Sequence, residues 1–204
     1  MVQIVRLENQ HVAQAAEVHM CAMPGFFLSF LGAGFLRQFY RSFVGNNEVV
    51  ALVAVEGEPQ AVLGLAVGPL APAGFFKRLL KRRWPAFCIA SMWALVRRPW
   101  ITPRIMRALT YRGEAPVGAA RALLSSLAVD PSAQGRGVGK KLVHAWVEQA
   151  RQAGAAGCYL TTDAVGNDQV NAFYRGMGWT LESSFTTPQG RQMNRYVLDL
   201  PATG

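Results

Sequence analysis

A glycine-rich segment at residues 127–142 constrains the fold of this chain more than any other feature. It reads Leu-Ala-Val-Asp-Pro-Ser-Ala-Gln-Gly-Arg-Gly-Val-Gly-Lys-Lys-Leu, which predicts a strand, a tight turn and the start of a helix. Gly135, Gly137 and Gly139 let the backbone approach a ligand closely, because no Cβ lies in the way. The first amides of a helix have no partner within it and lie at its positive end. The segment therefore predicts a phosphate-binding turn.

An apolar stripe supports the helix after this turn, and Gly154 is placed where a helix normally stops. The stripe consists of Leu142, Val143, Trp146, Val147 and Ala150. Two common phosphate loops fit the turn poorly. A P-loop needs Ser or Thr after Gly-Lys, where this chain has Lys141, and a dinucleotide-binding loop needs a longer second gap between glycines.

The pattern Gln134-x-x-Gly137-x-Gly139, after Leu127-Ala128-Val129-Asp130-Pro131, resembles the acetyl-CoA loop of the GCN5-related N-acetyltransferase (GNAT) family. The resemblance implies acetyl-CoA as cosubstrate, no metal, and a primary amine as acceptor. It also implies a set of cofactor-binding residues, which are Leu127, Ala128, Val129, Gln134, Gly135, Arg136, Gly137, Val138, Gly139, Lys140 and, from the segment described next, Asn167.

A second segment, residues 167–179, resembles the family pattern Asn-x-x-Ala-x-x-Phe-Tyr-x-x-x-Gly-Phe, with Val170 and Trp179 as conservative departures. Asn167 is a good N-cap for a short helix. The resemblance assigns Tyr174 as the acid that protonates the departing thiolate. A phenol with a pKa of about 10 stays protonated at neutral pH and can donate. The alternative is that Tyr174 only packs its helix on the sheet.

The general base is not identified by the sequence. Many family members use a Glu on the fourth strand, whereas residues 124–129 read Leu-Ser-Ser-Leu-Ala-Val and offer only hydroxyls. Asp130 reads as a turn residue. Glu17 and His19 lie on the first expected helix, and His144 follows the glycine-rich turn. A chain of water molecules acting as the base would leave no pattern in the sequence.

Composition favours one domain spanning residues 1–204. The chain is 51% apolar and long enough for one substantial core. Its three cysteines, Cys21, Cys88 and Cys158, have no metal or disulfide spacing, so we expect a reducing compartment and a cytoplasmic location. The first residues alternate like a strand and lack the apolar core of a signal peptide.

The resemblance also implies the fold, a mixed α+β architecture with a central, mostly antiparallel sheet flanked by helices. Periodicity places two helices before residue 45 and a hairpin around residues 56–59. The expected strands cover residues 2–7, 49–55, 61–67, 123–129, 157–162, 179–186 and 192–200.

A basic helical insertion at residues 69–116 separates the third and fourth expected strands. Residues 59–113 contain ten Lys and Arg and no Asp or Glu, against a formal net charge of +9 for the whole chain. The apolar stretch at residues 85–96 is shorter than the roughly 20 residues that cross a bilayer. The insertion either packs on the core with solvated charges, helps bind an anionic acceptor, or lies on an anionic membrane surface. We expect one of the first two, and no motif supports nucleic-acid binding.

The sequence therefore predicts an acetyl-CoA-dependent N-acetyltransferase acting on a small-molecule amine such as an amino sugar. The alternatives are a protein N-terminal or lysine acetyltransferase, and a non-catalytic acyl-CoA-binding module. A homodimer is also compatible with the sequence.

Overall fold

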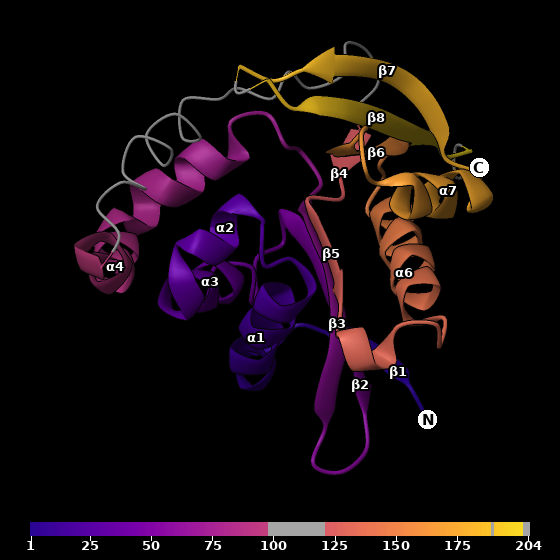
Figure 1. Ribbon diagram of the computed structural model, residues 1–204. Helices are drawn as coiled ribbons and strands as arrows, with labels where there is room; N and C mark the ends of the chain where they lie inside the picture. Colours follow the sequence, from indigo (N-terminus) through magenta and orange to yellow (C-terminus); the bar gives the residue numbers. More distant parts are fainter. Residues whose placement is uncertain (98–120, 189, 202–204) are drawn as a thin grey trace.

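The computed structural model describes residues 1–97, 121–188 and 190–201 (Figure 1). The strands are β1 (Gln3–Arg6), β2 (Val49–Glu56), β3 (Ala61–Pro69), β4 (Arg121–Leu123), β5 (Ser126–Val129), β6 (Gly157–Asp163), β7 (Thr180–Thr186) and β8 (Gln192–Asp199). The helices are α1 (Val12–Ala22), α2 (Phe27–Phe30), α3 (Gly32–Arg41), α4 (Phe75–Arg97), α6 (Val138–Gln152) and α7 (Asp168–Gly176). The second half of the expected insertion, from residue 98, lies outside the described residues.

The strands form two four-stranded sheets. The first has the order β1-β2-β3-β5 and is antiparallel throughout, and the second has the order β4-β6-β8-β7. In the second sheet β4 runs parallel to β6, and the other pairs are antiparallel. The expected mixed, mostly antiparallel α+β fold is therefore confirmed.

The fourth expected strand is interrupted, which corrects the prediction of one continuous strand over residues 123–129. The amide of Leu124 donates to Tyr159 O on β6 (3.0 Å), whereas the next amide, that of Ser125, donates to Val67 O on β3 (3.0 Å). The Ser125 hydroxyl donates to the same carbonyl. The strand thus changes partners between these two residues, so β4 belongs to one sheet and β5 to the other.

Helices cover both faces of the first sheet. Residues of β2 alternate, with Val53 and Val55 facing the core with α1 and α3, and Leu52 and Ala54 facing the core with α6. The expected stripe on α6 is confirmed at its centre, where Trp146 is fully buried and donates to Val50 O (3.1 Å).

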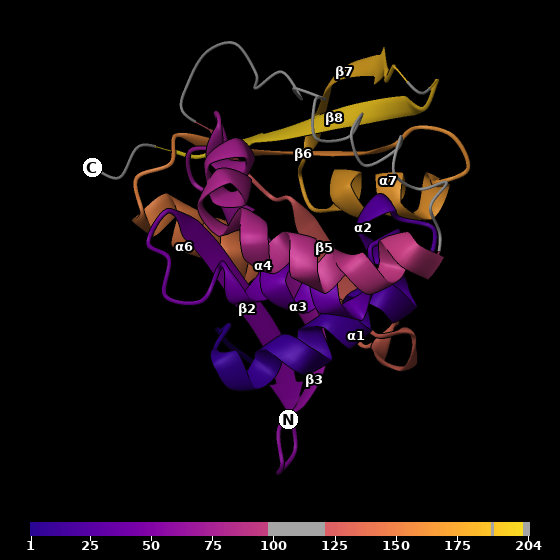
Figure 2. The same cartoon turned by 90° about the vertical axis from the view of Figure 1, so that its left-hand side faces the viewer.

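Helix α4 forms the outermost layer on the α3 side (Figure 2). Phe87 of α4 packs on Phe35 of α3 with ring centroids 4.9 Å apart. The axis bends at Arg83, whose backbone is not helical (φ −121°, ψ 21°), just before Pro85. Across the described residues, none of the helices is both long and apolar enough to span a bilayer.

We expect Gly68→Ala to reduce the free energy of unfolding by about 3 kcal/mol or more, because the strand break leaves no room for a side chain. A Cβ on Gly68 would lie 1.7 Å from Leu123 O and 2.9 Å from the Ser125 amide nitrogen. Gly176→Ala is the matched control, since a Cβ there meets nothing within 4 Å. Chemical denaturation measures both variants, and equal stabilities would contradict the proposed crowding.

Candidate active site

The glycine-rich turn joins β5 to α6 as the sequence predicts. Gly135 and Gly137 have φ values of +76° and +75°, a conformation that favours glycine. Gly137 caps α6 and has no side chain to bond the first amides. The first helical bond is that from the Lys141 amide to Gly137 O (3.1 Å). Within the described residues, the backbone amides of residues 138–140 therefore lack a partner and remain available as donors.

The side chains of this turn differ in what they can offer a ligand. Val138 is buried in the core and can present only its backbone. Gln134 and Lys140 are exposed. The Arg136 guanidinium instead bonds both carboxylate oxygens of Glu56 (2.8 and 2.7 Å), at the end of β2. This bond, the main cause of the lowered pKa of the Glu56 carboxyl, directs Arg136 toward the β2–β3 hairpin.

One edge of β5 is unpaired within the described part of the chain. The amide of Asp130 donates to Leu63 O (2.8 Å), and Ala128 lies opposite Leu65 on β3. Because the polar groups of a strand alternate in direction, those of Ala128 face β3 whereas those of Leu127 and Val129 point away. Their side of β5 faces the region where β5 and β6 separate. Of the three strand residues predicted to bind cofactor, two thus have free backbone groups and Ala128 does not.

The two sequence segments meet at the start of α6. A Cβ on Gly139 would lie 3.6 Å from the ring of Phe173 on α7 and 3.6 Å from Val129 Cγ2 on β5. The glycine-rich turn, the unpaired edge of β5 and α7 therefore adjoin one another. Tyr174 follows Phe173 directly and is 6% exposed.

Tyr174 is held by aromatic contacts rather than by hydrogen bonds. Its ring lies against Trp179 and Tyr196, with centroids 5.8 and 6.1 Å away. Its hydroxyl has no hydrogen-bond partner within the described residues. Burial raises the pKa of Tyr174, so the phenol remains protonated at neutral and mildly alkaline pH. It can therefore donate a proton to a group that reaches it.

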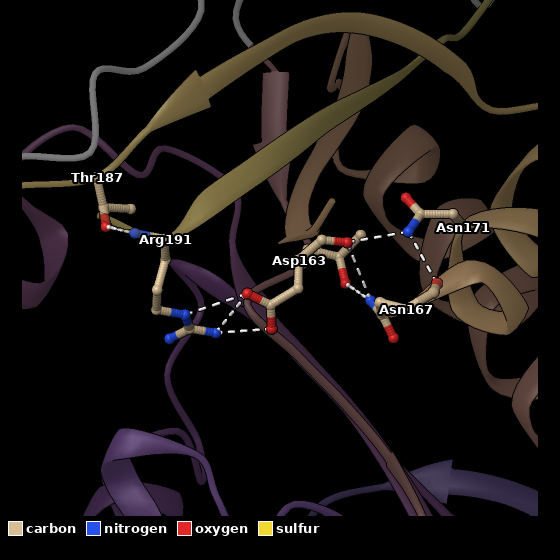
Figure 3. A network of polar contacts seen from close by, with 6 residues as sticks. Asp163, Asn167, Asn171, Thr187 and Arg191 are labelled. Carbon is tan, nitrogen blue, oxygen red and sulfur yellow. Dashed lines mark hydrogen bonds and ion pairs between the residues drawn. The ribbon is translucent and has the colours of Figure 1, made fainter. Parts of the chain in front are cut away.

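A network of asparagines fixes α7 on the second sheet (Figure 3). The Asn171 amide donates to Asp163 O (2.9 Å) and Asn167 O (2.8 Å), and its oxygen accepts from Asn194 and the Tyr196 hydroxyl. The Asp163 carboxylate forms an ion pair with Arg191 (2.7 Å). Asn171 is 3% exposed and orients the helix that carries Tyr174. Sequence reasoning missed it, although it follows Asn167 by one helical turn.

Asn167 occupies the N-cap position of α7 but makes no side-chain cap bond, contrary to the expected capping. Its amide donates instead to Thr162 Oγ1 (2.8 Å) and Asp163 O (3.2 Å). Both acceptors lie at the end of β6. Because the Asn167 side chain is bonded to them, it does not bond the amides at the start of α7. Asn167 therefore closes the β6–α7 turn.

The candidate bases have different surroundings. Glu17 is exposed and pairs with Arg37 (3.5 Å). His144 is exposed on α6. Asp130 accepts from the Ser132 hydroxyl and amide, and these bonds lower the pKa of its carboxyl. Within the described residues, no three His, Cys, Asp or Glu are grouped closely enough to hold a metal ion.

His19 lies on α1 and is fully buried against α3. Its Nδ1 lies 2.5 Å from the Tyr40 hydroxyl, which also hydrogen-bonds Ser126 on β5. Its Nε2 is buried without a partner among the described residues. Burial lowers the pKa of His19 to about 4, so the imidazole is neutral at physiological pH. It is a packed core histidine in this structure.

Comparisons with known proteins agree with this geometry. The model of the Acetyltransferase (GNAT) family matches residues 89–179, which include the turn and all of α7. An acetyltransferase of Desulfovibrio desulfuricans assigned to the GNAT family has a TM-score of 0.63 at 14% identity, over 98% of this chain and 99% of that one. No curated protein is significantly similar in sequence.

Two further solved structures share the fold. The ribosomal-protein-S18-alanine N-acetyltransferase of Escherichia coli has a TM-score of 0.61 at 15% identity, over 100% of this chain and 97% of that one. The acetyltransferase yncA of Salmonella typhimurium, solved with its cofactor acetyl-CoA, has a TM-score of 0.59 at 14% identity, over 100% and 96%. At these identities the likeness establishes the architecture.

We expect His19 to make the protein less stable as the pH falls. Above about pH 6.5 the imidazole is neutral in both states, whereas between this value and about 4 only the unfolded chain takes up the proton. The free energy of unfolding should therefore fall by up to about 1.4 kcal/mol per pH unit from this group. His19→Gln should reduce that slope in denaturation curves across this range. His144→Gln, at an exposed histidine, should keep the wild-type slope, and parallel curves for all three proteins would contradict the assignment.

Proposed function

We propose that this chain is an acetyltransferase of the GNAT family, as the match of the family model to residues 89–179 supports, and that it transfers the acetyl group of acetyl-CoA to the primary amine of a small molecule. One observation carries this proposal. The free edge of β5 runs from the amide-rich start of α6 to the region beside α7, which bears Tyr174. A single extended ligand with a phosphate group and a reactive end matches this arrangement.

Each part of acetyl-CoA has a complementary partner in the site. The amides of residues 135–140 suit the pyrophosphate, because they combine free donors with the positive end of α6. The free backbone groups of Leu127 and Val129 suit the amides of the pantetheine arm, which would add to β5 like a strand. Arg136, held by Glu56, would contribute its backbone amide rather than its charge.

The reaction needs one proton donor and one proton acceptor. A neutral amine attacks the thioester carbonyl, a C–N bond forms and the C–S bond breaks. The departing thiolate takes the phenolic proton of Tyr174, which its burial keeps in place until then. The amine loses its proton to solvent or to a base that the described residues do not single out.

The small-molecule acceptor is the finer part of this proposal and rests on the basic insertion at residues 69–116, in particular on the four arginines that follow α4 in the sequence. A protein N-terminus is the competing acceptor. Thiol release should be followed with a panel of amines that includes an amino sugar and an alanine-terminated peptide. Turnover of the peptide alone would replace the small-molecule assignment and leave acetyl transfer intact.

Acetyl-CoA should raise the melting temperature, and Gly137→Val should abolish most of that rise. Ligand at about 100 times its dissociation constant adds roughly 2.7 kcal/mol of stability. A valine at Gly137 is strained by the φ of +75° and enters the space beside the free amides.

Gly154→Val is the matched control, because Gly154 also has a positive φ of +84° and open space around its Cβ. It should lower the melting temperature of the free protein similarly but keep the shift with acetyl-CoA. If wild-type protein shows no shift with acetyl-CoA or CoA at saturation, the cofactor proposal is wrong.

Tyr174→Phe should lower turnover about 100-fold or more while changing acetyl-CoA affinity by less than about twofold. The substitution keeps the aromatic contacts, and it breaks no hydrogen bond within the described residues, so folding should be preserved. Tyr159→Phe, at a tyrosine on β6 that is 5% exposed, is the control and should keep normal turnover. An unchanged rate in Tyr174→Phe would leave Tyr174 with a packing role only.

A further inference from the structure

One side of α4 carries a strongly basic surface. Its inner side is seated on the core through Phe75, Leu79 and Phe87, which are 2%, 8% and 4% exposed. Several side chains between these positions are exposed, and Figure 2 shows that no other labelled element lies in front of α4. The exposed cations of this stretch are Lys77, Arg78, Lys81, Arg82 and Arg83.

Most of these cations have no counter-charge among the described residues. Arg78 pairs with Glu48 (3.5 Å) and donates to Ala73 O. Within the described residues, Lys77, Lys81, Arg82 and Arg83 make no ion pair. The sequence from residue 59 to residue 113 contains no Asp or Glu that could neutralise them locally. This surface therefore attracts anions.

Two large, exposed apolar side chains follow the cations in the sequence. Trp84 is 62% exposed and Ile89 is 68% exposed. They lie five positions apart on α4 and add exposed apolar area next to the cations. Tryptophan is favoured at a membrane–water interface, and cations beside it are attracted to anionic headgroups.

We propose that this outer surface of α4, formed by Lys77, Lys81, Arg82, Arg83, Trp84 and Ile89, docks on an anionic lipid surface, in place of the two uses that the sequence favoured for this part of the insertion. The four cations match the lipid phosphates, and Trp84 and Ile89 enter the boundary between headgroups and acyl chains. A nucleic acid would satisfy the cations but would leave Ile89 without a suitable contact. The bend at Arg83 separates the cationic turn from the apolar turn along the helix.

Docking there would leave the candidate active site accessible. Helix α4 packs on α3, and α1 packs on β5, so α1 and α3 lie between α4 and the free edge of β5 (Figure 1). The basic residues of α4 consequently lie away from that edge, which argues against a direct role for them in binding an acceptor. The inference is independent of acetyl transfer.

Vesicle co-sedimentation tests the proposal. The wild-type protein should bind vesicles of equal phosphatidylcholine and phosphatidylglycerol, and not vesicles of phosphatidylcholine alone. Binding should weaken as salt shortens the Debye length. The tryptophan fluorescence should shift to shorter wavelength on binding, and Trp84→Phe should remove most of that shift while retaining sedimentation.

Variants separate the contributions of charge and apolar insertion. Lys81→Gln and Arg82→Gln should each weaken binding about fivefold, the effect expected of one cation near an anionic surface. Trp84→Ala with Ile89→Ala should weaken it further at the same net charge. Arg6→Gln, at an exposed cation on β1, is the matched control and should change binding by less than about twofold.

Three results would overturn the proposal. They are absence of binding to the mixed vesicles, equal binding of the Trp84→Ala/Ile89→Ala double variant, and tighter binding of duplex DNA that depends on the same cations. All variants should retain the melting temperature and its shift with acetyl-CoA. A failure of lipid binding therefore leaves the acetyltransferase proposal untouched.

Discussion

The change of partner between Leu124 and Ser125 is the constraint on which the rest of this structure depends. Two successive amides bond to different sheets, one to Tyr159 O on β6 and the other to Val67 O on β3. The crossing is close enough that Gly68 has no room for a Cβ. Because the chain leaves β6 at this point and continues as β5, the backbone groups of Leu127 and Val129 stay unpaired along one edge of β5 within the described residues. A continuous strand would have closed that edge with ladder bonds and removed the place for an extended ligand.

The candidate site shows which features the sequence could predict. The turn and α6 follow from glycine spacing and an apolar stripe, both local signals, and both are confirmed at Gly135, Gly137 and Trp146. The strand break was missed because residues 123–129 contain no glycine, proline or charged residue that would mark an interruption. The break depends on the hydrogen bond from the Ser125 amide to Val67 O, and Val67 is far away in the chain. Asn171 was missed for the same reason, since three of its partners lie on β6 and β8.

Charge is distributed differently from what the composition alone suggests. Arg136 lies in the phosphate-type turn, yet Glu56 holds it with two bonds, so backbone amides are the main donors left there. The strongest cluster of unpaired cations in the described residues lies on α4, behind α1 and α3. The net charge of +9 is therefore a poor guide to the candidate cofactor site, because the unpaired cations gather on the outer surface of α4.

Burial sets the protonation of the two aromatic groups on either side of β5. Tyr174 is kept protonated and His19 is kept neutral, because each would lose solvation on ionising. Neither side chain therefore brings a charge to the free edge of β5 near neutral pH. A neutral surrounding suits the encounter of a thioester with an uncharged amine, and it disfavours entry of the ammonium form. For the proposed reaction this favours an amine that has already lost its proton when it meets the thioester, because residues 124–129 hold no carboxylate that could take it.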